Sequence, residues 1–179
     1  MIKTGEFFVP DQSSVDEIRV NLERYLFALR FCKDKIVLDA GCGAGLGTYL
    51  YSLMAKRVIA VDHNEDALNY AKRFPGEYPK VHFITADLEK DMLPDHEITI
   101  ALEVIEHLEH PDFFLSQLKG KEIVFSIPIP SLEISKFHKY DFKTIEEVKE
   151  IIGRYYKVEN YYLQEGIWVY GRGISLKNK

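Results

Sequence analysis

An α/β fold built as a three-layer sandwich is the class that the sequence predicts, and two observations carry the prediction. Short apolar segments expected to be strands alternate with segments of helical periodicity over residues 36–127. Such alternation is typical of a mostly parallel sheet with right-handed crossovers. The last two β-like segments are joined by Gln-Glu-Gly-Ile, residues 164–167, a connection that permits a hairpin but not a parallel crossover. We therefore expect a mostly parallel seven-stranded sheet with an antiparallel last strand.

The individual elements follow from the apolar periodicity and from capping residues. Ser13 and Ser14 are suited to cap a first helix at 15–31, whose apolar face is expected to hold Ile18, Leu22, Tyr25, Leu26 and Leu29. Further helices are expected at 46–55, 65–74, 111–118 and 145–152. Strands are expected at 36–38, 57–61, 81–85, 98–102, 122–127, 156–163 and 168–176.

Length and composition bound the class of protein. The chain has 179 residues, 46% of them hydrophobic and 28% charged, which fits one globular domain with its own core. We divide it into an N-terminal arm and helix at 1–33 and a cofactor-binding core at 34–179. The net charge of −5 disfavours a nucleic-acid partner, which would need a basic surface.

The expected compartment is the cytoplasm. Cys32 and Cys42 form no CxxC pair, which favours a reducing environment. The first residues lack the apolar core of a signal peptide, and no apolar run approaches the roughly 20 residues of a membrane span. We therefore expect no membrane partner.

A glycine-rich stretch follows the first predicted strand and opens the next helix. It reads Asp39-x-Gly41-x-Gly43-x-Gly45. Glycines there let the backbone turn sharply and approach a ligand, and a helix start offers free N–H groups. Asp62 ends the following strand, where an acid can accept hydrogen bonds from ribose hydroxyls. A cofactor containing a nucleoside is thus indicated.

The glycine spacing argues against a dinucleotide. The G-x-G-x-x-G/A fingerprint would require a third glycine or alanine, and this sequence has Leu46 or Thr48 there. A nucleotide-dependent oxidoreductase is accordingly disfavoured.

The D-x-G-x-G-x-G spacing resembles motif I of the Rossmann-like class I methyltransferases, which implies S-adenosyl-L-methionine as cofactor. In that family the acid at the place of Asp39 organises the amino-acid end of the cofactor. An acid at the place of Asp87 contacts the adenine amino group, and the backbone N–H of Leu88 faces the ring. Glu103 ends the fourth strand and should face the ligand crevice. The expected cofactor-binding residues are Asp39, Gly41, Cys42, Gly43, Gly45, Asp62, His63, Asp87, Leu88 and Glu103.

The resemblance extends to a methyltransferase subgroup often linked with sugar or surface-polysaccharide metabolism. The segments that resemble this subgroup are residues 4–10, Glu23–Ala28, Glu103–Leu108, Ser126–Pro128, 137–140 and Gln164. The chain departs from the subgroup at Asn21-Leu22, where Glu-His is usual, and after Pro128, where Pro-Asn is common. The resemblance implies a methyltransferase acting on a hydroxyl or amine of a small molecule or glycan.

The acceptor side is expected to depend on His107 and His138. A hydroxyl acceptor must lose its proton, and either histidine could act as the catalytic base. The segment 128–141 follows the fifth strand and is expected to form an acceptor loop. The other histidines, at 63, 82, 96 and 110, are expected to be solvated. The aromatic run of Tyr155, Tyr156, Tyr161, Tyr162, Trp168 and Tyr170 is expected to cover the last strands, where a homodimer interface could form.

Two alternatives remain open at this level. The first is a cofactor-binding partner subunit without catalysis. The second is a metal-dependent 2′-O-methyltransferase of RNA, because Glu103, Glu106, His107 and His138 resemble the metal ligands of small-RNA methyltransferases and, less closely, of ubiquinone-pathway O-methyltransferases. Oxygen and imidazole ligands would suit Mg²⁺ or Mn²⁺. The E-x-x-E-H pattern is common where no metal is known, so the working expectation is a site without metal.

Overall fold

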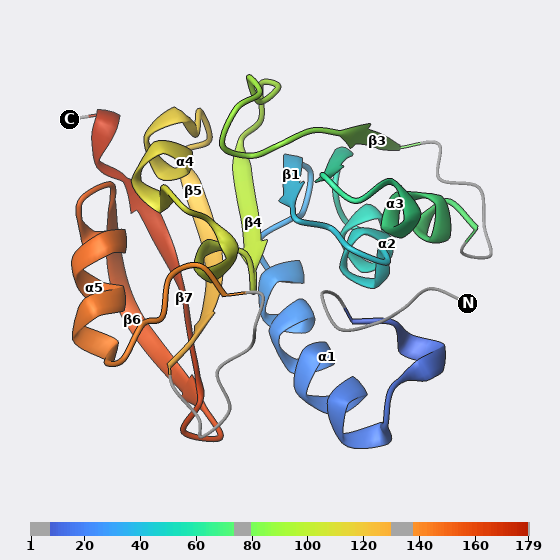
Figure 1. Cartoon of the computed structure of the whole chain (residues 1–179). Helices are drawn as coiled ribbons and strands as arrows, with labels where there is room; N and C mark the ends of the chain where they lie inside the picture. Colours follow the sequence, from blue (N-terminus) through green and yellow to red (C-terminus); the bar gives the residue numbers. More distant parts are fainter. Residues whose placement is uncertain (1–7, 74–79, 130–137, 179) are drawn as a thin grey trace.

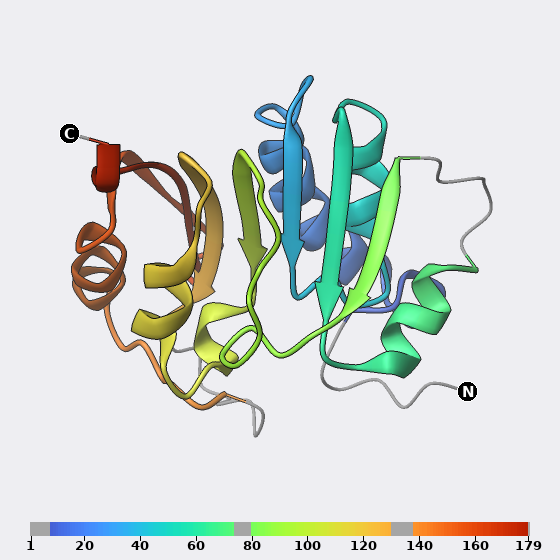
Figure 2. The ribbon, with the colours of Figure 1, turned by 90° about the horizontal axis from the view of Figure 1, so that it is seen from above.

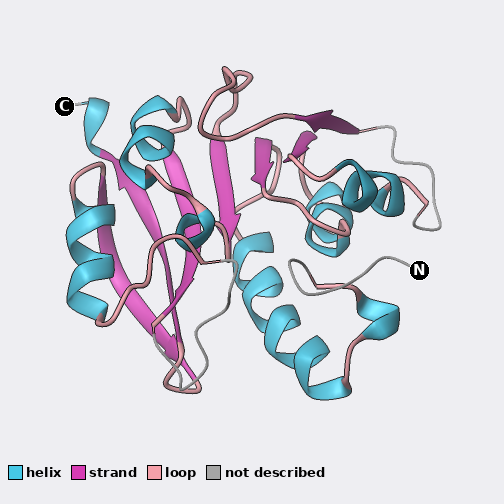
Figure 3. Cartoon of the chain, in the orientation of Figure 1, coloured by secondary structure: helices cyan, strands magenta, loops and turns pink. Residues whose placement is uncertain are grey.

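The computed structural model describes residues 8–73, 80–129 and 138–178. Helices and strands alternate along most of the chain (Figures 1 and 3). The strands are β1 (Ile36–Ala40), β2 (Arg57–Asp62), β3 (Val81–Thr85), β4 (Ile98–Leu102), β5 (Glu122–Pro128), β6 (Tyr156–Gln164) and β7 (Trp168–Ser175). The α-helices are α1 (Val15–Leu29), α2 (Leu46–Ser52), α3 (Glu65–Ala71), α4 (Pro111–Gln117) and α5 (Ile145–Gly153). Short 3₁₀ turns occur at η1 (Pro10–Gln12), η2 (Ile105–His107) and η3 (Leu176–Asn178).

The seven strands form one sheet in the order β3-β2-β1-β4-β5-β7-β6. The pairs from β3 to β5 are parallel, and β7 is antiparallel to both β5 and β6. Glu165 and Gly166 both have positive φ angles in the turn that joins β6 to β7. Three residues, 165–167, join the strands, and the backbone N–H of Ile167 donates to the carbonyl of Gln164 at 3.0 Å. Positive φ angles at both central residues of such a turn match the twist of a hairpin. The expected seven-stranded sheet with an antiparallel last strand is confirmed.

Two hydrophobic clusters lie on opposite faces of the sheet, so the three-layer expectation is also confirmed. Helices α1 and α2 lie on one face of the sheet, and α4 and α5 lie on the other (Figure 2). Phe27 and Tyr51 belong to the first cluster, and Phe114 and Ile152 belong to the second. Neighbouring residues of each strand contribute to opposite clusters because side chains alternate along a strand. The reversal of strand order between β1 and β4 leaves a crevice at the carboxyl ends of these strands, where ligands bind in open α/β sheets.

Helix α1 begins as expected, but its buried face agrees with the expected one only in part. Ser14 and Glu17 form a reciprocal capping box at its start. The buried residues are Val20, Arg24, Phe27 and Ala28, whereas Leu26 of the expected apolar face is about half exposed. The expectation holds for Tyr25 and Leu29, which pack against the core, but not for Leu26. The buried position of Arg24 could not be predicted from apolar periodicity.

Candidate functional site

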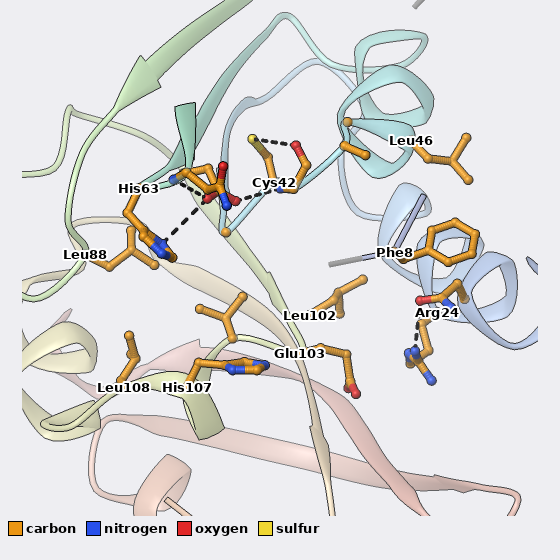
Figure 4. Close-up of a pocket in the computed structure, with 18 of the residues that line it drawn as sticks. Phe8, Arg24, Cys42, Leu46, His63, Leu88, Leu102, Glu103, His107 and Leu108 are labelled. Atoms are coloured by element: carbon orange, nitrogen blue, oxygen red, sulfur yellow. Dashed lines mark hydrogen bonds and ion pairs between the residues drawn. The ribbon is translucent and has the colours of Figure 1, made fainter. Parts of the chain in front are cut away.

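A cavity of about 1170 Å³ lies at the carboxyl ends of β1, β2 and β4. This volume is somewhat above the usual range for small-molecule sites, so it has room for more than one small ligand. Its lining includes every predicted cofactor-binding residue except Asp39, together with His107. Figure 4 shows Cys42 and His63 on one side of the cavity and Glu103 and His107 on the opposite side.

The glycine loop forms the first wall of this cavity. Gly41, Gly43 and Gly45 all have positive φ angles, a backbone region that favours glycine. A Cβ on Gly41 would lie 2.6 Å from Val104 Cγ2, and one on Gly45 would lie 2.6 Å from the Cβ of Ala71. The three glycines are therefore required by backbone conformation, and two of them also by close packing.

Asp62 fixes the loop from the end of β2. Its carboxylate accepts hydrogen bonds from the backbone N–H groups of Gly43, at 2.8 Å, and Asn64, at 2.9 Å. His63 Nδ1 lies 3.6 Å from the same carboxylate, and the His63 side chain is mostly exposed. Asp62 thus lines the cavity while it holds the glycine loop against β2.

Asp39 lies behind the loop rather than in the cavity wall. It is buried within β1, and its carboxylate accepts a hydrogen bond from Thr48 Oγ1 of α2. Burial raises the pKa of Asp39 to about 7, while the Thr48 hydrogen bond opposes this shift. A negative charge at Asp39 would therefore become favourable when a cation binds nearby.

Cys42 also belongs to the loop. Its backbone N–H donates to the carbonyl of Val61 at 3.0 Å, which ties β1 to β2. Burial raises the pKa of its thiol well above the ordinary value, so the thiol form dominates near neutrality.

Asp87 and Leu88 form another part of the wall, after β3. The Asp87 carboxylate accepts from the backbone N–H of Glu89 and from Lys90 Nζ, at 2.8 and 2.6 Å. These contacts lower the pKa of Asp87, with the Lys90 hydrogen bond as the largest cause. Leu88 is buried at the same wall. Both residues lie where an adenine ring would be expected, and their roles stay predictions.

Glu103 is held rigidly at the end of β4. Its φ of 56° is unusual for a residue other than glycine. One carboxylate oxygen accepts from Ser126 Oγ at 2.6 Å, and the other accepts from Trp168 Nε1 at 2.7 Å. Strained backbones of this kind concentrate at functional sites. The predicted crevice position of Glu103 is therefore accompanied by two partners, Ser126 and Trp168, that sequence reasoning did not assign to the site.

Arg24 is a further lining residue that the sequence reasoning missed. Its side chain is buried, with a relative exposure of 3%. It donates to the amide oxygens of Gln164, at 2.9 Å, and Asn21, at 3.2 Å, and lies over the Trp168 ring. Within the described ranges, no carboxylate forms an ion pair with Arg24. The sequence feature that could have indicated its burial is its spacing: Arg24 lies one helical turn after Val20 and one turn before Phe27 and Ala28, all of which are buried.

The two predicted catalytic histidines lie side by side. The rings of His107, in η2, and His138 are 5.1 Å apart between centroids, in an edge-to-face arrangement. Glu106, also in η2, is buried, and its Oε1 lies 3.9 Å from His107 Nε2. Burial raises the pKa of Glu106 well above its ordinary value, and the nearby Glu103 charge adds to the shift. His107 lines the cavity, whereas His138 is not among its lining residues.

The predicted acceptor loop at 128–141 is described only at its two ends. β5 stops at Pro128, as its missing N–H predicts, and Ile129 N donates to Ile167 O at 2.7 Å. At the other end, the backbone N–H groups of Lys139 and Tyr140 both donate to the carbonyl of Glu106. Residues 130–137, with Ser131, Ser135 and Lys136 among them, lie outside the described residues.

The expectation that the other histidines are solvated is wrong for His96. This side chain is buried in the connection between β3 and β4. Its Nε2 accepts from the backbone N–H of Gly120 at 3.1 Å and lies 2.9 Å from Thr99 Oγ1, while Nδ1 lies 2.8 Å from Pro94 O. Burial lowers the pKa of His96, so the neutral ring acts as a structural link. His82 and His110 are exposed, as expected.

Residues 37–119 match a family model described as a methyltransferase domain. A protein of Mycobacterium tuberculosis named a probable S-adenosylmethionine-dependent methyltransferase is 34% identical over 116 residues, covering 59% of this chain and 38% of that protein. A ubiquinone biosynthesis O-methyltransferase of Rickettsia bellii is 28% identical over 135 residues, covering 70% of this chain and 55% of that protein. The chain thus spans between about a third and just over half of the length of these relatives.

Solved structures agree on the fold. A SAM-dependent methyltransferase from Aquifex aeolicus superposes with a TM-score of 0.74 at 18% identity, covering 95% of this chain and all of that one. The N-methyltransferase NodS from Bradyrhizobium japonicum gives a TM-score of 0.71 at 17% identity, covering 90% of this chain and 99% of that one. Within the described residues, no helix is both long and apolar enough to cross a membrane. Residues 37–119 of this chain are thus similar to a methyltransferase domain, and the chain shares its Rossmann-like fold with these solved structures.

Proposed function

We propose that this chain binds S-adenosyl-L-methionine in the cavity and transfers its methyl group to a hydroxyl or amine of a small molecule or glycan. The observation that carries the proposal is one continuous cavity lined by the glycine loop and Asp62 on one side and by Glu103 and His107 on the other. Cofactor and acceptor would then meet without either crossing the protein. Such proximity supplies much of the rate enhancement for a cofactor that is already activated.

The cofactor would be held by charge at its amino-acid end and by hydrogen bonds at its ribose. Asp62 has carboxylate lone pairs beyond those used by Gly43 and Asn64, and these suit ribose hydroxyls. Arg24 supports an anion site, because both of its hydrogen-bond partners are neutral amides and the side chain is buried. A buried cation is costly unless an anion compensates it. We assign the α-carboxylate of the methionyl group to Arg24.

The reaction would form a bond between the acceptor oxygen or nitrogen and the methyl carbon, while the sulfonium carbon–sulfur bond breaks and S-adenosylhomocysteine leaves. A hydroxyl acceptor also loses a proton, and His107 is the base that we assign because its side chain lines the cavity. His138 would support His107 from behind. The ends of the acceptor loop adjoin Glu106 and the β6–β7 turn, which favours an acceptor site between them.

Calorimetry with S-adenosylmethionine, S-adenosylhomocysteine and NAD tests the cofactor. We expect the two sulfur-containing ligands to bind and NAD to show no heat of binding. Asp62→Ala should weaken S-adenosylhomocysteine binding by about 1.5–3 kcal/mol, the range for hydrogen bonds to a charged group. Asp95→Ala is the control, because Asp95 is an exposed acid paired with Lys119 outside the cavity.

Tight binding of NAD without binding of S-adenosylmethionine would overturn the proposal. Unchanged affinity for S-adenosylhomocysteine in a folded Asp62→Ala protein would show that Asp62 does not hold the ribose. Methyl transfer is tested next. A panel of compounds with hydroxyl or amine groups is incubated with the protein and S-adenosylmethionine that carries a labelled methyl group, and the label transferred to each compound is measured. Cofactor binding without methyl transfer to any acceptor would favour a cofactor-binding partner subunit instead.

A further inference from the structure

Arg24 is a buried cation with two carboxylates in its neighbourhood. Glu23 precedes it in α1, and Glu103 lines the same cavity (Figure 4). Within the described residues, the hydrogen bonds of Arg24 go to neutral amides, and neither acid forms an ion pair with it. A buried charge without a counter-ion is costly, so opposite charges this close normally pair. The separation of these charges therefore requires an explanation.

Trp168 separates Arg24 from Glu103. The guanidinium carbon of Arg24 lies 4.7 Å from the centroid of the indole ring, over its face. At the edge of the ring, Nε1 donates to one oxygen of the Glu103 carboxylate at 2.7 Å, and Ser126 Oγ donates to the other. A cation over an aromatic face and an N–H group that donates to a carboxylate are both favourable contacts. The indole thus gives each charge a partner that does not neutralise it.

Gln164 separates Arg24 from Glu23 in a similar way. Its amide oxygen accepts from Arg24 Nη1 at 2.9 Å. Its amide nitrogen donates to the Glu23 carboxylate at 2.8 Å and to the carbonyl of Val20 at 3.1 Å. Because both amide hydrogens are used on that side, the oxygen is left to face Arg24. A neutral side chain again stands between the cation and the acid.

The two separating residues are cross-strand partners at the end of the β6–β7 hairpin. Gln164 ends β6, Trp168 begins β7, and the antiparallel register pairs them directly. Directly opposed residues of antiparallel strands present their side chains on the same face of the sheet. Both side chains contact Arg24, so this face is the one turned to α1. One pairing of the hairpin therefore delivers both side chains to Arg24 at once.

We propose that Gln164 and Trp168 are positioning residues that keep Arg24 free of an ion pair, so that the site selects a ligand with a carboxylate. This inference rests on the proposed function, in which Arg24 binds the α-carboxylate of the methionyl group. An ion pair with Glu23 or Glu103 would neutralise the guanidinium, whereas neutral partners leave its full charge for the ligand. A ligand without the carboxylate would leave the buried cation uncompensated and should bind weakly.

Two ligands separate the carboxylate from the rest of the cofactor. S-adenosylhomocysteine carries the α-carboxylate, whereas 5′-methylthioadenosine has the same nucleoside and a thioether but no amino-acid group. In calorimetry, the wild type should bind S-adenosylhomocysteine more tightly by about tenfold or more, as expected for a hydrogen bond between charged groups. Binding of 5′-methylthioadenosine to each variant is the check that the variant is folded and that its nucleoside site is intact.

Trp168 is tested in two backgrounds. Trp168→Leu removes the ring face and the N–H group, so Arg24 can pair with Glu103, and S-adenosylhomocysteine binding should weaken about tenfold. In a Glu103→Gln background the same substitution should change the affinity by about twofold at most, because this carboxylate is no longer there to pair with Arg24. Trp168→Phe keeps the ring face over which Arg24 lies and should lose less affinity than Trp168→Leu. A purely structural role of the indole would instead give the same loss in both backgrounds.

Gln164 is tested by exchanging it with Glu23. Gln164→Glu combined with Glu23→Gln keeps the composition and the net charge but moves the carboxylate next to Arg24. S-adenosylhomocysteine binding should weaken by about tenfold or more, and 5′-methylthioadenosine binding should not change. Tyr162→Leu is the control for the loss of an aromatic ring, because Tyr162 lies on the same hairpin, is 43% exposed and is not among the lining residues of the cavity.

The outcomes keep this inference and the proposed function distinct. A wild type that binds neither ligand would reject the proposed function, and this inference with it. A wild type that binds S-adenosylhomocysteine but shows the same affinity for 5′-methylthioadenosine would reject the selection alone. An equal loss from Trp168→Leu in both backgrounds, or an unchanged affinity after the exchange of Gln164 and Glu23, would reject the positioning role and leave the proposed function standing.

Discussion

The two sides of the cavity are assembled in different ways. On the side of the glycine loop, the hydrogen bonds join residues close in sequence: Asp39 and Thr48 are 9 residues apart, and Gly43 and Asp62 are 19 apart. On the side lined by Glu103 and Arg24, Glu103 and Trp168 are 65 residues apart, and Arg24 and Gln164 are 140 apart. The glycine-loop side therefore depends on local backbone geometry, and the Glu103 side depends on how distant elements meet.

The sharpest test of this contrast compares two glycines with positive φ angles. Gly45, in the cofactor loop, would place a Cβ 2.6 Å from Ala71 Cβ, whereas Gly166, in the β6–β7 turn, has open space around it. Gly45→Ala should lower the free energy of unfolding by about 3 kcal/mol, from left-handed backbone strain and overpacking together. Gly166→Ala should cost about 1 kcal/mol, since only the strain applies. Urea denaturation measures both, and equal losses would contradict the packing argument.

A second test uses Asp39, the buried acid on the glycine-loop side. The pKa of Asp39 is raised to about 7 in the folded protein, against an ordinary value of about 3.9 in the unfolded chain. The folded state therefore holds this proton more tightly, and its contribution to stability is lost as the pH rises from about 4 towards 7. Asp39→Asn should remove this component.

The measurement for Asp39 is the difference in unfolding free energy between Asp39→Asn and the wild type without ligand. Between pH 5.5 and 7 this difference should grow in favour of the variant by about 1.5 kcal/mol, which follows from the linkage relation for a single proton. Taking the difference cancels the other titrating groups, among them His96, whose lowered pKa acts in the opposite direction. A difference that stays constant with pH would show that Asp39 is ionised in the folded protein throughout.

The smallest expected effect lies on the Glu103 side of the cavity, at the ion pair between Arg19 of α1 and Glu165 of the β6–β7 turn. Both side chains are about half exposed, at 55% and 42%. Breaking the pair with Arg19→Gln should cost about 0.2–1 kcal/mol, as for other surface ion pairs. A double-mutant cycle with Glu165→Gln isolates the interaction, which should weaken in 0.5 M salt. Coupling above about 2 kcal/mol would mean that this pair, rather than the buried Arg24–Gln164 contact, holds the turn to α1.

The sequence predicted most of the fold because its signals are local. Strand β3 and strand β4 were predicted with the bounds that the structure has, and the start of every α-helix agrees. The predicted helix at 46–55 is shorter in the structure, since α2 ends at Ser52. Helix ends depend on where the chain must turn back to the next strand, and that is set by the sheet rather than by local propensity.

The same reasoning was less successful for side chains whose partners are far away in sequence. His96 has no local feature that distinguishes it from an exposed loop histidine, yet its Nε2 accepts a hydrogen bond from the backbone N–H of Gly120, 24 residues away. Arg24 is a charged residue of the kind usually found on the solvated face of a helix, yet Gln164 and Trp168 cover it. Each of these environments arises only when β4, β5 or the β6–β7 turn is brought against the residue.

By itself, the sequence determined the parallel α/β architecture, the antiparallel end of the sheet and the wall of the cavity that is made by Gly41, Gly43, Gly45 and Asp62. These features depend on residues that are close together in the sequence. They are the period-two and helical patterns, the short connections and the positions that need positive φ angles. Only the tertiary structure decided which face of α1 is buried, how Ser126 and Trp168 hold Glu103, and that His138 lies against Glu106 and His107. These contacts depend on the packing of separate elements, and the direction of a side chain across such a contact is set by both partners at once.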